Sequence, residues 1–114
     1  MAPISKFKNA IESSIGNSYT ILYTAPAGKD SYLIELDVAS TGNTGVQVSV
    51  RVHDASTSVT AHIVKAAPVP VGSALQVISG QKIVLEEGDY IELICDTPGE
   101  EVDAVLSLIE DVNN

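Results

Sequence analysis

Hydrophobic and polar residues alternate along most of this chain. The clearest run, VQVSVRV over residues 46–52, places four valines on one face and polar side chains on the other. A period of two is typical of a β-strand with one buried face. The same alternation occurs over residues 34–38 (Ile34, Leu36 and Val38 inward) and 91–96. Over residues 102–109 both faces carry apolar side chains, although Asp103 and Ser107 lie on one of them, which predicts a strand that is central or has its outer face covered by another subunit.

Turn-forming residues separate these runs at short intervals. The turns are Pro26-Ala27-Gly28, Thr41-Gly42-Asn43, Asp54-Ala55-Ser56, Pro70-Val71-Gly72, Ser79-Gly80, Glu87-Gly88-Asp89 and Pro98-Gly99. Short strands divided in this way are typical of antiparallel all-β domains. We therefore predict an all-β fold, an antiparallel β-sandwich of jelly-roll or Ig-like type with about seven or eight short strands.

The first eighteen residues fit two structures. Ile4, Phe7, Ile11 and Ile15 have helical spacing, and Gly16 would end such a helix. The last three of these apolar residues also share one strand face. We favour an N-terminal arm or edge segment over residues 1–18 and a β-sandwich domain over residues 19–114. We expect deletion of residues 1–18 to leave the sandwich folded and to weaken assembly.

The composition limits the core and the compartment. The chain has 114 residues, enough for one domain, with no Trp and one Phe, so Val, Ile, Leu and Ala must form the core. Cys95 is the single cysteine, which excludes an intrachain disulfide and favours a small core residue over a nucleophile. No apolar run reaches membrane-spanning length, and residues 1–20 lack a signal-peptide pattern.

The charge is acidic and unevenly distributed. The net charge is −9, and ten of the fifteen acidic residues lie between Glu86 and Asp111, where there is no Lys or Arg. Such a chain is repelled by nucleic acid and by anionic membranes, so neither is predicted as a partner. Solubility is the simpler explanation of the acidity, and a basic protein partner is the alternative.

Two groups of residues have some features of metal sites. His53 and His62 flank a predicted hairpin, in which His62 would lie opposite Arg51. An adjacent arginine opposes a cation, so we favour solvent-facing histidines over a divalent metal site. Glu86-Glu87-Gly88-Asp89 lacks the alternating ligands of an EF-hand, and a turn explains it. Calcium held between this turn and Glu100, Glu101 and Asp103 is the alternative, and no cofactor is predicted.

No catalytic constellation is present. No serine, histidine and aspartate form a nucleophile motif, and no glycine run resembles a phosphate-binding loop. Glu35 and Asp37 share one strand face, which we interpret as solvated, with Arg51 as a candidate partner. The chain has four tyrosines, Tyr19, Tyr23, Tyr32 and Tyr90. They could line a sugar site, but positions in the core and at its rim are the simpler interpretation. We predict that the chain is not an enzyme.

Several turn motifs in a fixed order resemble those of a known class of proteins. They are LYTAPAGK at residues 22–29, TGNTG at 41–45, VPVG at 69–72, LEEGDY at 85–90 and EVDAVLSLIE at 101–110. This pattern, which spans about residues 19–110, resembles small β-sandwich virion structural proteins of tailed bacteriophages. The resemblance implies a non-enzymatic assembly role, either as a capsid decoration or cement protein or as a neck or tail component.

The resemblance carries further expectations. It implies a homo-oligomer, with a trimer favoured, that binds the major capsid protein or other virion proteins and is made in the cytoplasm of a bacterial host. The alternatives are a neck, tail or fibre-anchoring protein and a carbohydrate-binding module. We expect the assembly contacts to come from the N-terminal segment and the last strand. The candidate residues are Lys6, Phe7, Lys8, Ile11, Ile15, Val105 and Ile109.

Overall fold

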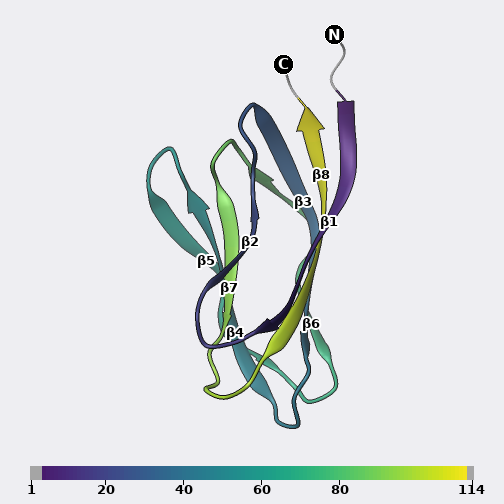
Figure 1. Cartoon of the computed structure of the whole chain (residues 1–114), viewed down its shortest axis with the longest axis vertical. Helices are drawn as coiled ribbons and strands as arrows, with labels where there is room; N and C mark the ends of the chain where they lie inside the picture. Colours follow the sequence, from purple (N-terminus) through teal and green to yellow (C-terminus); the bar gives the residue numbers. More distant parts are fainter. Residues whose placement is uncertain (1–3, 113–114) are drawn as a thin grey trace.

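The protein is a sandwich of two four-stranded antiparallel sheets (Figure 1). A computed structural model describes the backbone of residues 4–112 and the side chains of residues 6–79 and 83–110. The strands are β1 (Ile4–Ile15), β2 (Thr20–Thr24), β3 (Lys29–Ser40), β4 (Val46–Asp54), β5 (Val59–Val69), β6 (Ala74–Leu85), β7 (Tyr90–Cys95) and β8 (Val102–Val112). The described residues include no helix with the length and hydropathy needed to cross a membrane.

The strand order identifies the sandwich as a jelly roll. One sheet has the order β1-β8-β3-β6 and the other has the order β2-β7-β4-β5. Only β4 and β5 are both consecutive in the chain and neighbours in a sheet; every other connection crosses between the sheets. An Ig-like sandwich has several consecutive strands paired within a sheet, whereas the jelly roll has this crossing pattern. The predicted all-β sandwich is confirmed, and its jelly-roll form is the one observed.

The core lies between the two sheets and is built mainly from Leu, Val and Ile. Its largest fully buried side chains are Leu33, Leu36, Ile78, Leu85, Ile91, Leu93, Leu106, Leu108, Val38, Val48, Val50 and Val69. Cys95 is also fully buried, and burial raises the pKa of its thiol. The prediction that this cysteine is a small core residue is therefore confirmed.

A β-bulge modifies the predicted alternation in β3. Leu33 pairs with Leu108 of β8, whereas Glu35 pairs with Ser107, so Ile34 is the extra residue between them. Leu33 and Leu36 are both fully buried and Ile34 is only half-buried. Such a bulge re-aims the following side chains. Leu36 and Val38 face inward as predicted, but the inward position expected for Ile34 belongs to Leu33.

The N-terminal segment is an edge strand and not a helix. β1 runs antiparallel to β8, with Ile4 opposite Val112 and Glu12 opposite Ala104. The register then shifts before Ile15, where Ser14 has a φ of 57°. This irregularity turns the end of the strand inward, so Ile15 is 2% exposed and belongs to the core. β8 lies between β1 and β3, which makes it a central strand.

Candidate assembly surface

The outer face of the β1-β8-β3-β6 sheet carries an apolar row. The register places Phe7 opposite Ile109, Ile109 opposite Tyr32, and Tyr32 opposite Val84. This row crosses all four strands because cross-strand partners point to the same face of a sheet. Phe7 is 79% exposed and Val84 is 54% exposed. Two large apolar side chains at the ends of one row are therefore open to solvent.

Two more apolar residues lie on the same face, four residues along β1 and β8. Ile11 is opposite Val105, and these side chains are 66% and 41% exposed. Between the two apolar pairs, Ser107 donates a hydrogen bond to the Asn9 side chain at 3.2 Å. We call the four apolar residues Phe7, Ile11, Val105 and Ile109 the outer quartet. Exposed apolar side chains gathered on one face of a sheet mark an interaction site more often than isolated exposed residues do.

The structure places the seven predicted contact residues in different environments. Four of them form the outer quartet, and Lys6 is exposed on β1. Lys8 points to the inner side of the sheet, where its ammonium group meets Glu110. Ile15 is in the core and is not accessible to a partner, because the register shift in β1 turns it inward. The outer quartet therefore contains fewer residues than the predicted set of contact residues.

A shallow hollow of about 310 Å³ lies beside the quartet. Its lining residues come from β1, β3 and β8: Phe7, Lys8, Asn9, Ile34, Ser107 and Leu108. The bulge in β3 contributes to it directly, since Ile34 is the residue that the bulge adds. The volume is at the small end of the range for ligand pockets. It matches an apolar side chain of a partner better than a large ligand.

Two neighbouring carboxylates lie next to this hollow on β3. A side-chain hydrogen bond between Glu35 and Asp37, followed by the repulsion between their charges, raises the pKa of Glu35. The predicted partner of these acids, Arg51, lies on β4 in the other sheet and bonds Glu92 instead. That pairing prediction was wrong because the jelly-roll order separates β3 from β4. None of the ion pairs among the described residues involves Glu35 or Asp37.

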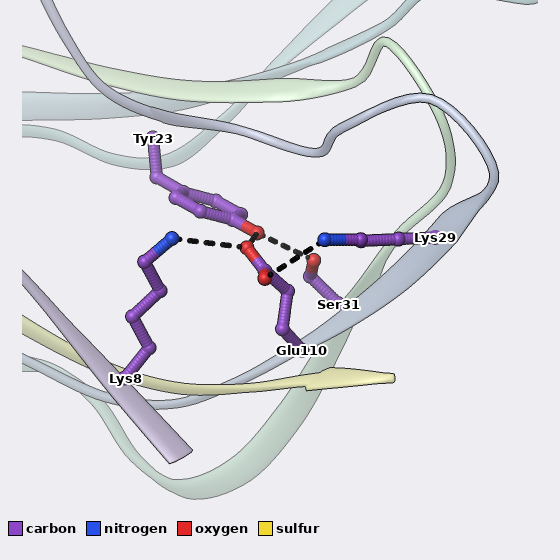
Figure 2. A network of polar contacts seen from close by, with 5 residues as sticks. All are labelled: Lys8, Tyr23, Lys29, Ser31 and Glu110. Atoms are coloured by element: carbon purple, nitrogen blue, oxygen red, sulfur yellow. Dashed lines mark hydrogen bonds and ion pairs between the residues drawn. The ribbon is translucent and has the colours of Figure 1, made fainter. Parts of the chain in front are cut away.

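A buried carboxylate, Glu110, connects both sheets at the end where β1 begins and β8 ends (Figure 2). Tyr23 of β2 donates a hydrogen bond to Glu110 at 2.6 Å, and Ser31 donates to the Tyr23 oxygen at 2.8 Å. Lys8 and Lys29 lie 3.3 and 3.6 Å from the two Glu110 oxygens. The Glu110 side chain is only 4% exposed. Strands β1, β2, β3 and β8 are therefore tied together by one carboxylate.

The network changes the pKa values of its members in opposite directions. The hydrogen bond from Tyr23, helped by Lys8 and Lys29, lowers the pKa of Glu110 although burial opposes this shift. Burial and the Glu110 carboxylate raise the pKa of Tyr23 to about 12. The residue pattern alone did not predict this network. One signal was present, because Glu110 continues the inward positions of β8 after Leu106 and Leu108.

The outer face of the second sheet carries polar and aromatic side chains together with the exposed Ile21. The Arg51 guanidinium carbon lies 3.5 Å above the centre of the Tyr19 ring, and the His53 and Tyr90 rings stack at 4.8 Å. His62 lies opposite Arg51, as predicted for the hairpin. The two histidines have separate partners, since His53 meets Thr60 and His62 meets Tyr19. Within the described residues, no group of three or more His, Cys, Asp or Glu side chains is placed to hold a metal.

The two acidic groups considered for calcium lie at opposite ends of the sandwich (Figure 1). Asp89 belongs to the β6–β7 turn, where its two oxygens accept hydrogen bonds from the Ala55 and Glu86 amides. Glu100 and Glu101 lie in the β7–β8 connection beside Gly42 and Thr41 at the other end. The length of β7 separates the groups, so the shared calcium site was a wrong alternative. The same separation places acidic residues of the stretch between Glu86 and Asp111 at both ends of the sandwich.

The four tyrosines do not form one platform. Tyr23 is buried in the Glu110 network, and Tyr32 lies on the outer face of the β1-β8-β3-β6 sheet. Tyr19 and Tyr90 lie on the other sheet, where Arg51 and His53 cover one side of each ring. A sugar site that uses all four rings is therefore excluded.

The fold is shared with viral capsid proteins and with a pilus. No protein-family model matches the sequence, and no curated protein matches it. A chain of the acidic-stable capsid of Helicobacter pylori bacteriophage KHP30 has 12% identity and a TM-score of 0.55, covering 99% of this chain and 94% of that one. A chain of the disulfide-linked pili of Bacillus endospore appendages has 13% identity and a TM-score of 0.55, covering 96% and 86%.

A larger viral protein contains the same fold as one part. A chain of T=1 particles derived from infectious bursal virus has 12% identity and a TM-score of 0.61, and the match covers 97% of this chain. This chain spans only 32% of that protein's length. At these identities the similarities establish the jelly-roll fold, which occurs in both closed shells and fibres.

Proposed function

We propose that this chain is a non-enzymatic structural protein of a virus particle, and more specifically a capsid decoration or cement protein of a bacteriophage. The observation that carries the proposal is the outer quartet. Its four apolar side chains gather on the outer face of a sheet whose inner face carries part of the hydrophobic core. A surface of this kind has no role in the fold of one copy and fits contact with another protein.

The fold and the turn motifs support the same proposal. A phage capsid chain of nearly the same length shares the jelly roll, as the mutual coverage of 99% and 94% indicates. When many linked copies of a protein bind a repeating lattice, the overall binding is much stronger than the binding of one copy. Each single contact can therefore be weak, and the contact surface on each copy can be small. One patch beside one shallow hollow is consistent with such a contact.

The proposal includes an oligomer and a location. Decoration proteins bind symmetric lattices as symmetric oligomers, and we propose a homo-oligomer with a trimer as the first expectation. The partners are the major capsid protein or other virion proteins, the location is the virion, and synthesis takes place in the bacterial cytoplasm. The buried thiol of Cys95 fits synthesis in a reducing compartment.

A neck, tail or fibre-anchoring component is the second candidate. The observation that favours it is the similarity in fold to a pilus chain, since that chain assembles into a fibre. The link between subunits would differ from a disulfide, because Cys95 is the single cysteine here and is fully buried.

Sedimentation with viral shells tests the proposal. Shells of the virus that encodes the chain are stripped of accessory proteins and mixed with the wild type, with Phe7→Ser or with Val59→Ser. Val59 is 57% exposed on β5 of the other sheet, so Val59→Ser is a matched loss of an exposed apolar side chain. We expect the wild type and Val59→Ser to sediment with shells and Phe7→Ser to bind more weakly. Binding to isolated tails but not to shells would favour the second candidate.

A further inference from the structure

We infer that the outer face of the β1-β8-β3-β6 sheet receives a shell-protein segment with two features. One is an apolar side chain that enters the hollow between β1, β8 and β3. The other is an arginine or lysine that binds Glu35 and Asp37 together. This inference rests on the proposed function and names the chemistry of the partner.

The hollow and the two carboxylates are adjacent. Ser107 lines the hollow, and its direct cross-strand partner in β3 is Glu35. Directly opposite side chains lie about 5 Å apart, and Asp37 follows two residues later on the same face. One partner segment can therefore reach both features with side chains that are close in its own sequence.

The charges on this face argue for a cationic partner. Glu35 and Asp37 take no part in any ion pair among the described side chains, whose three ion pairs all end on Glu92 or Glu110. The contact between the two carboxyl groups already makes ionisation of Glu35 less favourable. The planar guanidinium group of an arginine can donate hydrogen bonds to two carboxylates at once, and its positive charge would offset the repulsion between them.

The same charges argue against a second copy of this chain as the occupant. Lys8 and Lys29 are bound to Glu110 on the inner side of the sheet. A second copy that presented the same face would bring its own Glu35 and Asp37 towards these carboxylates. Like charges brought together across an interface oppose association.

The face has a suitable size for a specific contact. A sheet of four strands about 4.8 Å apart, each nine residues long at about 3.4 Å per residue, has a flat projected area of roughly 500–600 Å². Protruding side chains make the solvent-accessible area of the face larger than its projected area. The accessible area is therefore on the order of the ~800 Å² that each partner contributes to a standard interface. The contact can therefore be made by this sheet without the rest of the molecule.

Shell binding of two charge-matched double variants tests the inference. Glu35→Gln/Asp37→Asn removes the acid pair, and Glu100→Gln/Glu101→Gln removes two charges at one end of the sandwich. Sedimentation with stripped shells gives the apparent affinity at low and high salt, and the solution mass and thermal melt of each variant are measured alongside. We expect the acid-pair variant to bind at least about tenfold more weakly and to lose most of its salt dependence. The control should bind like the wild type.

The outcomes separate the inference from the proposed function. If the wild type does not bind shells, the proposed function fails and the inference fails with it. If the wild type and both variants bind equally, the proposed function stands and the inference is overturned. If the acid-pair variant changes the solution mass while shell binding is unchanged, the face joins copies of this chain and the inference is also overturned.

Discussion

The Tyr23 hydroxyl donates a hydrogen bond to Glu110 at 2.6 Å across the space between the two sheets (Figure 2). It joins β2 of one sheet to β8 of the other at the end where β1 and β3 supply two lysines. A buried carboxylate is tolerated only when its oxygens have partners, and here each oxygen has at least one. The network therefore holds β1 and β8, the two strands that carry the outer quartet, to β2 and β3.

Replacing Glu110 with Gln should lower the free energy of unfolding by about 2–4 kcal/mol. The substitution leaves Lys8 and Lys29 without their anion and weakens the bond from Tyr23. Urea unfolding followed by circular dichroism measures the change. Glu101→Gln, at an exposed position, serves as the control and should stay within about 0.5 kcal/mol of the wild type. Equal unfolding midpoints for Glu110→Gln and the wild type would show that the network adds no net stability.

Stability should fall in acid because of Glu110. Its pKa is lowered in the folded protein, so its contribution is present above its unfolded pKa of about 4.3 and is lost as the pH falls through the folded value. Urea midpoints between pH 6 and pH 2.5 test this. We expect the wild type to lose more stability over this range than Glu110→Gln. Parallel curves for the two proteins would contradict the assignment.

Stability should also fall in strong alkali because of Tyr23. Its pKa is raised to about 12 in the folded protein, so its contribution is intact below its unfolded pKa of about 10 and is lost as the pH rises towards 12. Tyr23→Phe should remove this alkaline dependence. Tyr90→Phe is the control, since the Tyr90 hydroxyl has no part in the Glu110 network, and it should keep the dependence.

Two isoleucines of β1 should respond differently to truncation. Ile15 is 2% exposed and Ile11 is 66% exposed. We expect Ile15→Ala to cost about 2–5 kcal/mol of folding free energy, because it leaves a cavity in the core. Ile11→Ala should stay within about 0.5 kcal/mol in stability and should weaken shell binding. Thermal melts and sedimentation with shells measure both properties, and the reverse pattern would contradict the positions of these side chains.

Deletion of residues 1–18 is now expected to disrupt the fold. The sequence favoured a separable segment, but β1 covers one side of β8 along most of its length and supplies Ile15 to the core. Removing it also takes Lys8 from Glu110. We expect loss of cooperative melting in calorimetry. A sharp transition near the wild-type temperature would support the separable arm of the original expectation.

Local patterns in the sequence predicted the strands well. The alternation of Val46 to Val52 and the glycine and proline turns reflect backbone geometry that the nearby residues impose themselves. The hairpin register that places His62 opposite Arg51 could be predicted for the same reason, because a short turn fixes it.

Long-range features were not predictable in the same way. The partner of Arg51 depends on which strand lies beside β4, and no local pattern encodes that order. The bulge at Ile34 and the inward turn of Ile15 are register changes set by a neighbouring strand. Four of the seven predicted contact residues form the outer quartet because their positions in β1 and β8 point to the same face of the sheet. Ile15 would point to that face in a regular strand, but the irregularity at Ser14 turns it into the core.

A cryo-electron microscopy map of the shell with this chain bound would show which face of the sandwich meets the shell. We propose that this is the outer face of the β1-β8-β3-β6 sheet. We expect Phe7, Ile109 and the Glu35–Asp37 pair to lie against shell protein, with a basic side chain beside the two carboxylates. A map in which the outer face of the β2-β7-β4-β5 sheet meets the shell, and the outer quartet faces solvent, would contradict it.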